Sequence, residues 1–201
     1  MKLYFSPGAC SLSPHICLRE AGLAFDLEQV DLAAKKTKGG ADYWKINPKG
    51  YVPALELRAG EVVTEGPAIV QYIADQKPDA GLAPKAGTPE RRQAQERLNF
   101  ISSEIHKTLG WLFNKQLPEG FRAIAVERLG KRLDVVSADL DGKQYLAGDK
   151  FGVADAYLFT VLRWTKPLQI SLDKWPNLSA FMERVASRPS VQAALKAEGI
   201  A

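Results

Sequence analysis

A segment rich in proline and glycine divides the chain into two parts with different residue periodicities. Residues 77–87 read KPDAGLAPKAG and show no helical period, which is typical of a linker. Residues 1–80 hold 9 basic and 10 acidic side chains, whereas residues 81–201 hold 18 and 13. A chain of 201 residues accommodates two domains of ordinary size. We therefore expect one domain at residues 1–80 and another at 88–201, joined by a linker at 81–87.

The first part alternates short strands with helices. Ser13 is a common N-cap residue, Pro14 suits the first helical position and Gly22 suits the helix end. A strand–helix–strand start predicts a parallel pair with a right-handed crossover, and a hairpin around residues 58–60 adds an antiparallel edge. The predicted order is β-α-β-α-β-β-α. Its strands are expected at residues 2–5, 26–30, 54–57 and 61–64, and its helical segments at 14–21, 42–46 and from 65 or 66 to 74.

The second part is predicted to be entirely helical. A core-facing stripe with spacings of 3, 4, 4 and 3 residues supports one long helix from residue 88 to about 115. The stripe consists of Leu98, Ile101, Ile105, Leu109 and Leu112. Further helices are expected at residues 119–140, 153–165, 176–187 and 190–197.

The composition excludes several classes of protein. Apolar residues make up 46% and charged residues 25%, as in soluble globular proteins. The net charge of +4 is too small and too evenly spread to predict a nucleic-acid partner. No apolar run is long enough to span a membrane or to serve as a signal peptide. Two cysteines cannot form a disulfide scaffold, so we expect a cytoplasmic protein, and we expect no metal.

Cys10 follows a predicted strand and immediately precedes a predicted helix. The free backbone N–H groups and the dipole of a helix start favour an anion, so this position predicts a lowered thiol pKa. Residues 10–13 also read as a C-x-x-C motif with serine in the second place, which favours a mixed disulfide with a small thiol. An unreactive loop cysteine is the alternative. Cys17 lies inside the helix among apolar residues, and we expect it to be packed in the core.

Three further groups of residues suggest a binding site. Pro53, which removes an N–H and can be cis, would hold the Val52 backbone toward an extended ligand, although an ordinary turn also fits. Glu65, at a strand–helix junction, suits an amino acid head group, although it also complements the dipole of its own helix. The members of a third group are spaced 4 and 3 residues apart, so they share one polar face of a helix. Two tryptophans would form an apolar wall beside this face, although they also fit as core residues. The third group consists of Asn99, Ser103 and His106, with Trp111 and Trp164 as the wall.

Taken together, these features resemble the soluble glutathione transferases, and most closely the bacterial Beta class. The resemblance covers essentially the whole chain. It rests on residues 4–11 (YFSPGACS), 47–55 (NPKGYVPAL), 64–65 (TE) and 151–156 (FGVADA), together with His106. It implies a thioredoxin-like α/β N-terminal domain, an all-α C-terminal domain, and a homodimer that binds glutathione where the domains meet.

The resemblance also implies roles for individual residues. Cys10 would contact the glutathione sulfur and His106 would assist it, as the two catalytic residues. The glutathione-binding residues would further comprise Lys35, Val52, Pro53, Glu65, Gly66, Asn99, Ser103, Glu104 and Ile105, with Ser103 and Glu104 reaching the ligand of the neighbouring subunit. The electrophile pocket would include Lys107, Trp111 and Trp164.

Two residues depart from the family pattern. The residues that match it are consistent with two reaction modes. The family usually has serine at position 66 and serine or threonine at position 152, where this chain has Gly66 and Gly152. In one mode the glutathione thiolate attacks a small hydrophobic electrophile. In the other, Cys10 forms a mixed disulfide and supports disulfide exchange, peroxide reduction or reductive dehalogenation. A non-catalytic ligand carrier or regulatory binding protein is the alternative to an enzyme.

Overall fold

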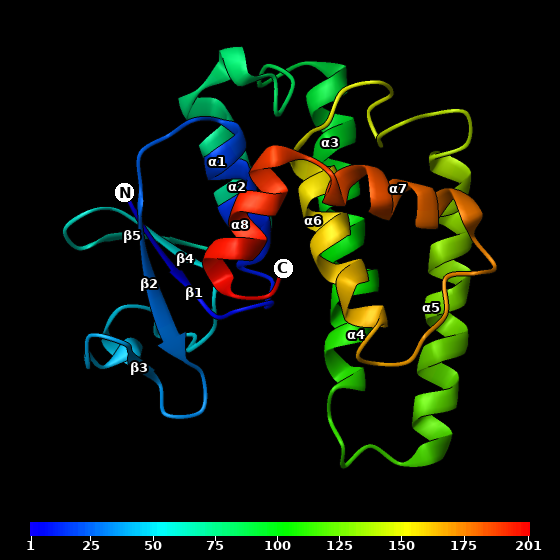
Figure 1. Cartoon of the computed structure of the whole chain (residues 1–201), viewed down its shortest axis with the longest axis horizontal. Helices are drawn as coiled ribbons and strands as arrows, with labels where there is room; N and C mark the ends of the chain where they lie inside the picture. The colour runs from blue at the N-terminus through cyan, green and yellow to red at the C-terminus, as the bar shows by residue number, and fades with distance from the viewer.

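The first part of the chain forms a mixed five-stranded sheet in the computed structural model (Figure 1), which describes residues 1–201 apart from the side chain of Glu119. The strand order is β3-β2-β1-β4-β5. Strands β1 and β2 are parallel, and the other neighbouring pairs are antiparallel. The parallel start and the hairpin are therefore as predicted. The strands are β1 (Lys2–Phe5), β2 (Asp26–Asp31), β3 (Lys36–Thr37), β4 (Ala54–Arg58) and β5 (Glu61–Thr64).

The rest of the chain is helical, and every predicted helix is present within a few residues of its expected bounds. The long helix predicted from residue 88 to 115 is interrupted by a π-helical segment, η3, and ends at Leu112. The helices are α1 (Leu12–Glu20), α2 (Gly66–Gln76), α3 (Pro89–Phe100), α4 (Lys107–Leu112), α5 (Glu119–Asp139), α6 (Val153–Leu162), α7 (Pro176–Ala186) and α8 (Pro189–Glu198). Shorter helical segments are η1 (Tyr43–Lys45), η2 (Pro78–Ala80), η3 (Ile101–His106) and η4 (Arg163–Thr165).

Helix α1 begins two residues earlier than predicted, so Ser11 and not Ser13 occupies the N-cap position. The Ser11 hydroxyl does not cap the helix, because it accepts from the Ser6 N–H at 3.1 Å and donates to the Ser6 carbonyl at 3.2 Å. The Ser13 hydroxyl donates to the Cys10 carbonyl at 3.2 Å. These contacts give the loop between β1 and α1 a fixed shape, and Cys10 lies in that loop.

Helix α1 is central to the packing of the molecule. It contacts α2, α6 and α8, and Figure 1 shows the C-terminal helix α8 returning to lie beside it. All side chains from Leu12 to Leu18 are buried, including Cys17, which is completely buried as predicted. The main hydrophobic core runs through the sheet-bearing and the helical parts of the chain. A second, smaller cluster consists of Tyr4, Val30, Tyr43, Val52 and Ala54. Among the described residues, no helix combines the length and apolarity needed to cross a bilayer.

The start of α6 is held by a buried carboxylate. Asp155 accepts from the N–H groups of Leu146 and Gly152, each at 2.8 Å. Burial raises the pKa of Asp155 to about 6, although both N–H groups lower it. Gly152 has no side chain to complete a reciprocal cap, and a Cβ there would lie 2.9 Å from the Leu82 carbonyl oxygen. Glycine at position 152 therefore permits close approach of the two backbone segments.

Candidate active site

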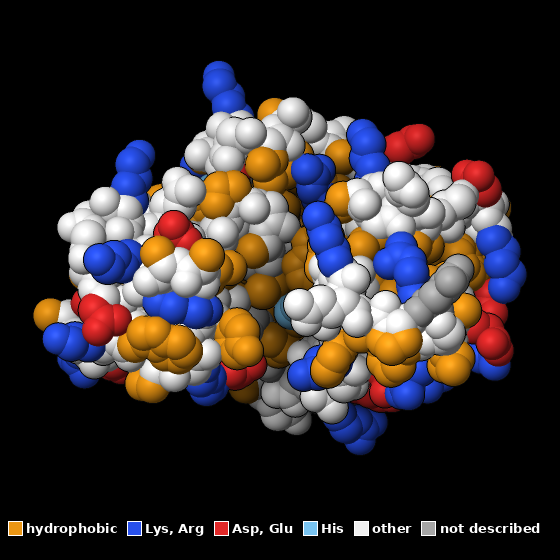
Figure 2. Space-filling model, turned by 90° about the horizontal axis from the view of Figure 1, so that it is seen from below, with side chains coloured by type: hydrophobic (Ala, Val, Ile, Leu, Met, Phe, Trp, Pro, Cys, Tyr) orange, Lys and Arg blue, Asp and Glu red, His pale blue; other side chains and the backbone are white. Residues whose placement is uncertain are grey.

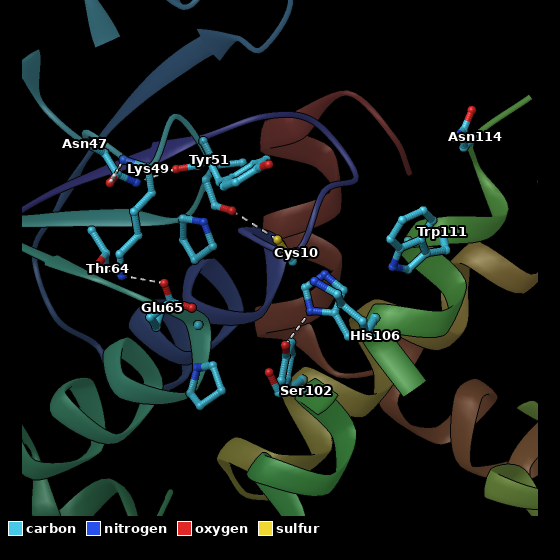
Figure 3. Close-up of a pocket in the computed structure, with 17 residues that line it drawn as sticks. Cys10, Asn47, Lys49, Tyr51, Thr64, Glu65, Ser102, His106, Trp111 and Asn114 are labelled. Atoms are coloured by element: carbon cyan, nitrogen blue, oxygen red, sulfur yellow. Dashed lines mark hydrogen bonds and ion pairs between the residues drawn. The ribbon is translucent and has the colours of Figure 1, made fainter. Parts of the chain in front are cut away.

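A cavity of about 760 Å³ lies between the sheet-bearing part and the helical part. Figure 2 shows hydrophobic side chains deep in the cleft between the two parts, and Figure 3 shows the side chains that line the cavity. They come from the loops before α1 and β4, the β5–α2 junction, η3, α4 and α6. The lining residues are Cys10, Asn47, Lys49, Tyr51, Val52, Pro53, Thr64, Glu65, Gly66, Pro67, Ser102, His106, Lys107, Gly110, Trp111, Asn114 and Tyr157.

The Cys10 thiol faces the cavity, but its acidity is the opposite of the sequence prediction. Its Sγ–H donates to the Val52 carbonyl at 3.1 Å. Burial raises the pKa of Cys10 to about 12, and the backbone N–H groups of Cys10 and Ser11 offset only part of that effect. The expectation of a lowered pKa was wrong because the loss of hydration around the sulfur outweighs the helix start. The Cys10 side chain is therefore a thiol at neutral pH.

The loop before β4 presents the Val52 backbone to the cavity. The Val52–Pro53 peptide bond is cis, and the Tyr51 carbonyl accepts from the Tyr43 hydroxyl at 2.8 Å and from the Asn47 amide at 2.7 Å. Tyr43 is fully buried, so it anchors this loop to the core. The backbone beside Val52 is thus fixed before any ligand contacts it.

Glu65 lies at the turn between β5 and α2 in a conformation unusual for a residue with a side chain, at a φ of 71°. Its carboxylate accepts from the Lys49 ammonium at 2.6 Å, and Lys49 also donates to Thr64 at 3.0 Å. The Glu65 side chain remains 64% exposed. It can therefore exchange Lys49 for another ammonium group without unfolding the turn.

His106 is uncharged at neutral pH. Burial is the main cause that lowers its pKa to about 4, and the neighbouring Lys107 ammonium adds to this effect. Its Nδ1 is 2.5 Å from the Tyr157 hydroxyl, whose pKa burial raises above its ordinary range. The Trp164 ring packs edge-on against the imidazole, with 4.9 Å between ring centroids. The side chain is thus held in place on two sides.

The comparisons with known proteins agree with this geometry. Two family models match the chain: the N-terminal domain of glutathione S-transferases at residues 8–76 and their C-terminal domain at residues 100–189. Glutathione S-transferase GstA of Escherichia coli O157:H7 is 46% identical over 200 residues, which cover 100% of both chains. The chain belongs to the glutathione S-transferase family.

Solved structures of bacterial glutathione transferases are similar over the full length. A ternary complex of BphK, a bacterial transferase, is 55% identical with a TM-score of 0.97, covering 99% of this chain and 100% of the other. A Beta-class transferase of Sphingomonas chungbukensis is 50% identical with a TM-score of 0.95, and both chains are covered in full. This chain is therefore a glutathione transferase with a thioredoxin-like domain followed by a helical domain, as the motifs predicted. The carrier alternative finds no support among these relatives.

Several predicted site residues of this transferase do not line the cavity. Asn99 and Ser103 lie on exposed positions, Glu104 pairs with Arg128 and Arg132, and Ile105 is completely buried in the core. The predicted common face of residues 99, 103 and 106 assumed an uninterrupted α-helix. The π-helical segment η3 adds a residue to that turn, so Ser102 and not Ser103 shares the cavity with His106.

Two further predicted residues act beside the cavity. The Lys35 ammonium donates to the Gly50 carbonyl at 2.8 Å and lies over the rings of Trp44 and Tyr51. The Trp164 indole N–H donates to the Gly8 carbonyl at 2.9 Å while its ring supports His106. Both residues therefore shape groups that line the cavity, whereas Lys107 and Trp111 line it themselves.

Sequence reasoning assigned no site role to seven polar residues that line the cavity: Asn47, Lys49, Tyr51, Thr64, Ser102, Asn114 and Tyr157. Lys49 lies within the quoted 47–55 motif, and its closeness to Val52 was the available signal. Tyr157 directly follows residues 151–156 in a largely apolar helix, which marks it only weakly. Ser102 is four residues before His106, a spacing that places both on one face of an ordinary α-helix, and this spacing was the available signal.

Proposed function

We propose that this transferase binds glutathione along the Cys10 side of the cavity and conjugates it to small hydrophobic electrophiles on the Trp111 side. One observation carries the proposal: the Val52 backbone, the Glu65 carboxylate and the Cys10 thiol line one cavity. Glutathione offers matching groups. Its cysteinyl backbone can pair with Val52, its ammonium with Glu65, and its γ-glutamyl carboxylate with the Gly66 N–H at the start of α2.

The proposed mechanism uses His106 as a hydrogen-bond donor. The Tyr157 hydroxyl keeps its proton and can donate to Nδ1, which leaves the proton of the neutral imidazole on Nε2. An Nε2–H group directed at the bound sulfur stabilises the glutathione thiolate. The thiolate then attacks the electrophilic carbon, and the leaving group departs with the bonding electrons.

In this mechanism Cys10 does not act as the nucleophile. With a pKa of about 12, its thiol is a hydrogen-bond donor, and its attack on a disulfide is slow. We expect Cys10→Ala to retain most of the aryl-halide conjugation while losing any glutathione-dependent disulfide reduction. Paired assays of the two activities on purified variant and parent protein check this. An equal loss of both activities would contradict the proposed role.

Gly66→Ser should bind glutathione more tightly than the parent protein. A Cβ at Gly66 would lie 3.9 Å from the Tyr157 ring and 4.0 Å from Pro53, which is ordinary contact, so serine fits. Its hydroxyl adds one hydrogen bond to the γ-glutamyl carboxylate, worth about 0.5–1.5 kcal/mol, or a roughly 2- to 12-fold lower Kd. Calorimetric titration with glutathione measures the change, and Gly66→Ala fills the same space without the hydroxyl. A weaker affinity of the serine variant would refute this assignment.

We also propose a cytoplasmic homodimer that detoxifies electrophiles. Ser103 is exposed, and neither Ser103 nor Glu104 lines the cavity of its own chain, which supports a place for both beside the ligand of a second subunit. A reducing cytoplasm keeps glutathione in the thiol form that the mechanism needs. Light scattering of the purified protein determines its mass, and a monomer would exclude the shared site.

A further inference from the structure

One face of α4 and the residues after it forms the wall of the cavity farthest from Glu65 (Figure 3). Lys107, Gly110, Trp111 and Asn114 are spaced 3, 1 and 3 residues apart, so they share one helical face. A Cβ at Gly110 would meet no atom within 4 Å, so the middle of this face is open. Trp111 lines the cavity and is 49% exposed. The face therefore offers a flat surface on which an aromatic ring can lie.

Among the described side chains, the charged groups on the Glu65 side of the cavity are paired, whereas the charged group on the Trp111 side is not. The carboxylate that lines it, Glu65, is held by Lys49 at 2.6 Å. Lys107 is exposed, and it forms no ion pair with any carboxylate whose side chain the structure describes. Its charge reaches the interior of the cavity, since it contributes to the lowered pKa of His106. An uncompensated positive charge thus stands beside the aromatic surface.

We propose that this face selects aromatic electrophiles that carry a carboxylate, with Lys107 as the specificity-determining residue. The inference rests on the conjugating function proposed above and names the substrate class of that same site. The ring would stack on Trp111 across Gly110, and its carboxylate would pair with the Lys107 ammonium. In the reaction, a C–S bond forms at the ring carbon that bears the halogen. The carbon–halogen bond breaks, halide leaves with the electron pair, and the thiol proton passes to water.

A matched pair of substrates tests the proposal. The acid 4-chloro-3,5-dinitrobenzoate and its methyl ester share the reacting carbon and differ in the charge of one substituent. For each protein, kcat/KM is measured with both compounds and divided by the uncatalysed rate with glutathione. The ratio of acid to ester then reports charge selection alone. The variants are Lys107→Met, Lys107→Arg and, as matched control, Lys115→Met, which removes an exposed lysine that does not line the cavity.

We expect Lys107→Met to lower the acid-to-ester ratio by about fivefold, the size of a partly exposed ion pair. Lys107→Arg and Lys115→Met should leave the ratio close to that of the parent. Raising the salt concentration should lower the ratio of the parent protein but not that of Lys107→Met, because salt screens exposed charges. A ratio that is the same in parent and Lys107→Met would overturn the proposal. Absence of turnover with both compounds in the parent protein would instead refute the proposed conjugating function.

Discussion

Replacing Glu198 with alanine should lower the free energy of unfolding by about 2–5 kcal/mol. The Glu198 side chain is completely buried at the end of α8. One carboxylate oxygen accepts from the Gly8 N–H at 2.9 Å, and the other contacts Nδ1 of the equally buried His15 at 2.8 Å. Alanine leaves both donors without an acceptor, and an unpaired buried polar group costs more than a hydrogen bond contributes.

The hydrogen-bond directions around His15 explain why Glu198 has to be an acceptor. The Arg19 Nε–H donates to Nε2 of His15 at 2.9 Å, so the proton of the imidazole lies on Nδ1 and points at Glu198. Glutamine at position 198 would offer one oxygen and one amide N–H to two donors. Glu198→Gln should therefore lose part of the stability that Glu198→Ala loses in full.

Glu198→Ala should also lower the turnover rate, because Gly8 lies in the loop that carries Cys10. Glu198 holds the Gly8 N–H and Trp164 holds the Gly8 carbonyl, so Glu198→Ala removes one of two anchors. Guanidinium unfolding measures the stability change, and a conjugation assay below the unfolding transition measures activity. Glu183→Ala, which removes an exposed glutamate on α7, is the control and should change stability by less than about 0.5 kcal/mol. A loss no larger than this control would show that the buried contacts are not stabilising.

The parts of the fold that could be predicted are those whose sequence signals lie within a single helix or strand. Helices α5, α7 and α8 were predicted within a few residues, because apolar periodicity and flanking prolines act within one element. Strand β3 was missed because it contains only Lys36 and Thr37, which are too few for a period. The start of α1 was misplaced by two residues because the Ser11 hydroxyl bonds Ser6 across the loop, a contact that no local rule contains.

The residues of the candidate site were predictable where a motif fixes the backbone position. They were not predictable where tertiary contacts determine the pKa or the orientation of a side chain. Val52, Glu65 and His106 line one cavity, as expected from their motifs. The acidity of Cys10 was predicted in the wrong direction, because the helix start is visible in the sequence whereas the burial of the sulfur is not. The prediction that residues 99, 103 and 106 share one face of the long helix was wrong for a related reason. A π-helical turn is too short to change the periodicity of the sequence visibly.

His106→Phe should lower kcat/KM for conjugation by about 10²-fold, the usual cost of losing one directed donor to a developing anion. Phenylalanine keeps a ring against Trp164 but lacks the Nε2–H that stabilises the thiolate. The bound thiol then ionises at higher pH, so the acid limb of the pH–rate profile should move upward. Tyr157→Phe removes only the partner of Nδ1 and should have a smaller effect on rate.

A stability measurement separates this catalytic role of His106 from a structural one. The pKa of His106 is about 4 in the folded protein, below its ordinary value of 6.5. Between these values the unfolded chain binds the proton that the folded protein excludes, so acid destabilises the parent protein as pH falls from 6.5 to 4. His106→Phe has no such proton to bind and should lose that part of the pH dependence while remaining slow at neutral pH. If the variant instead kept the parent rate and pH–rate profile, the thiolate would have to be stabilised by the backbone near Cys10 alone.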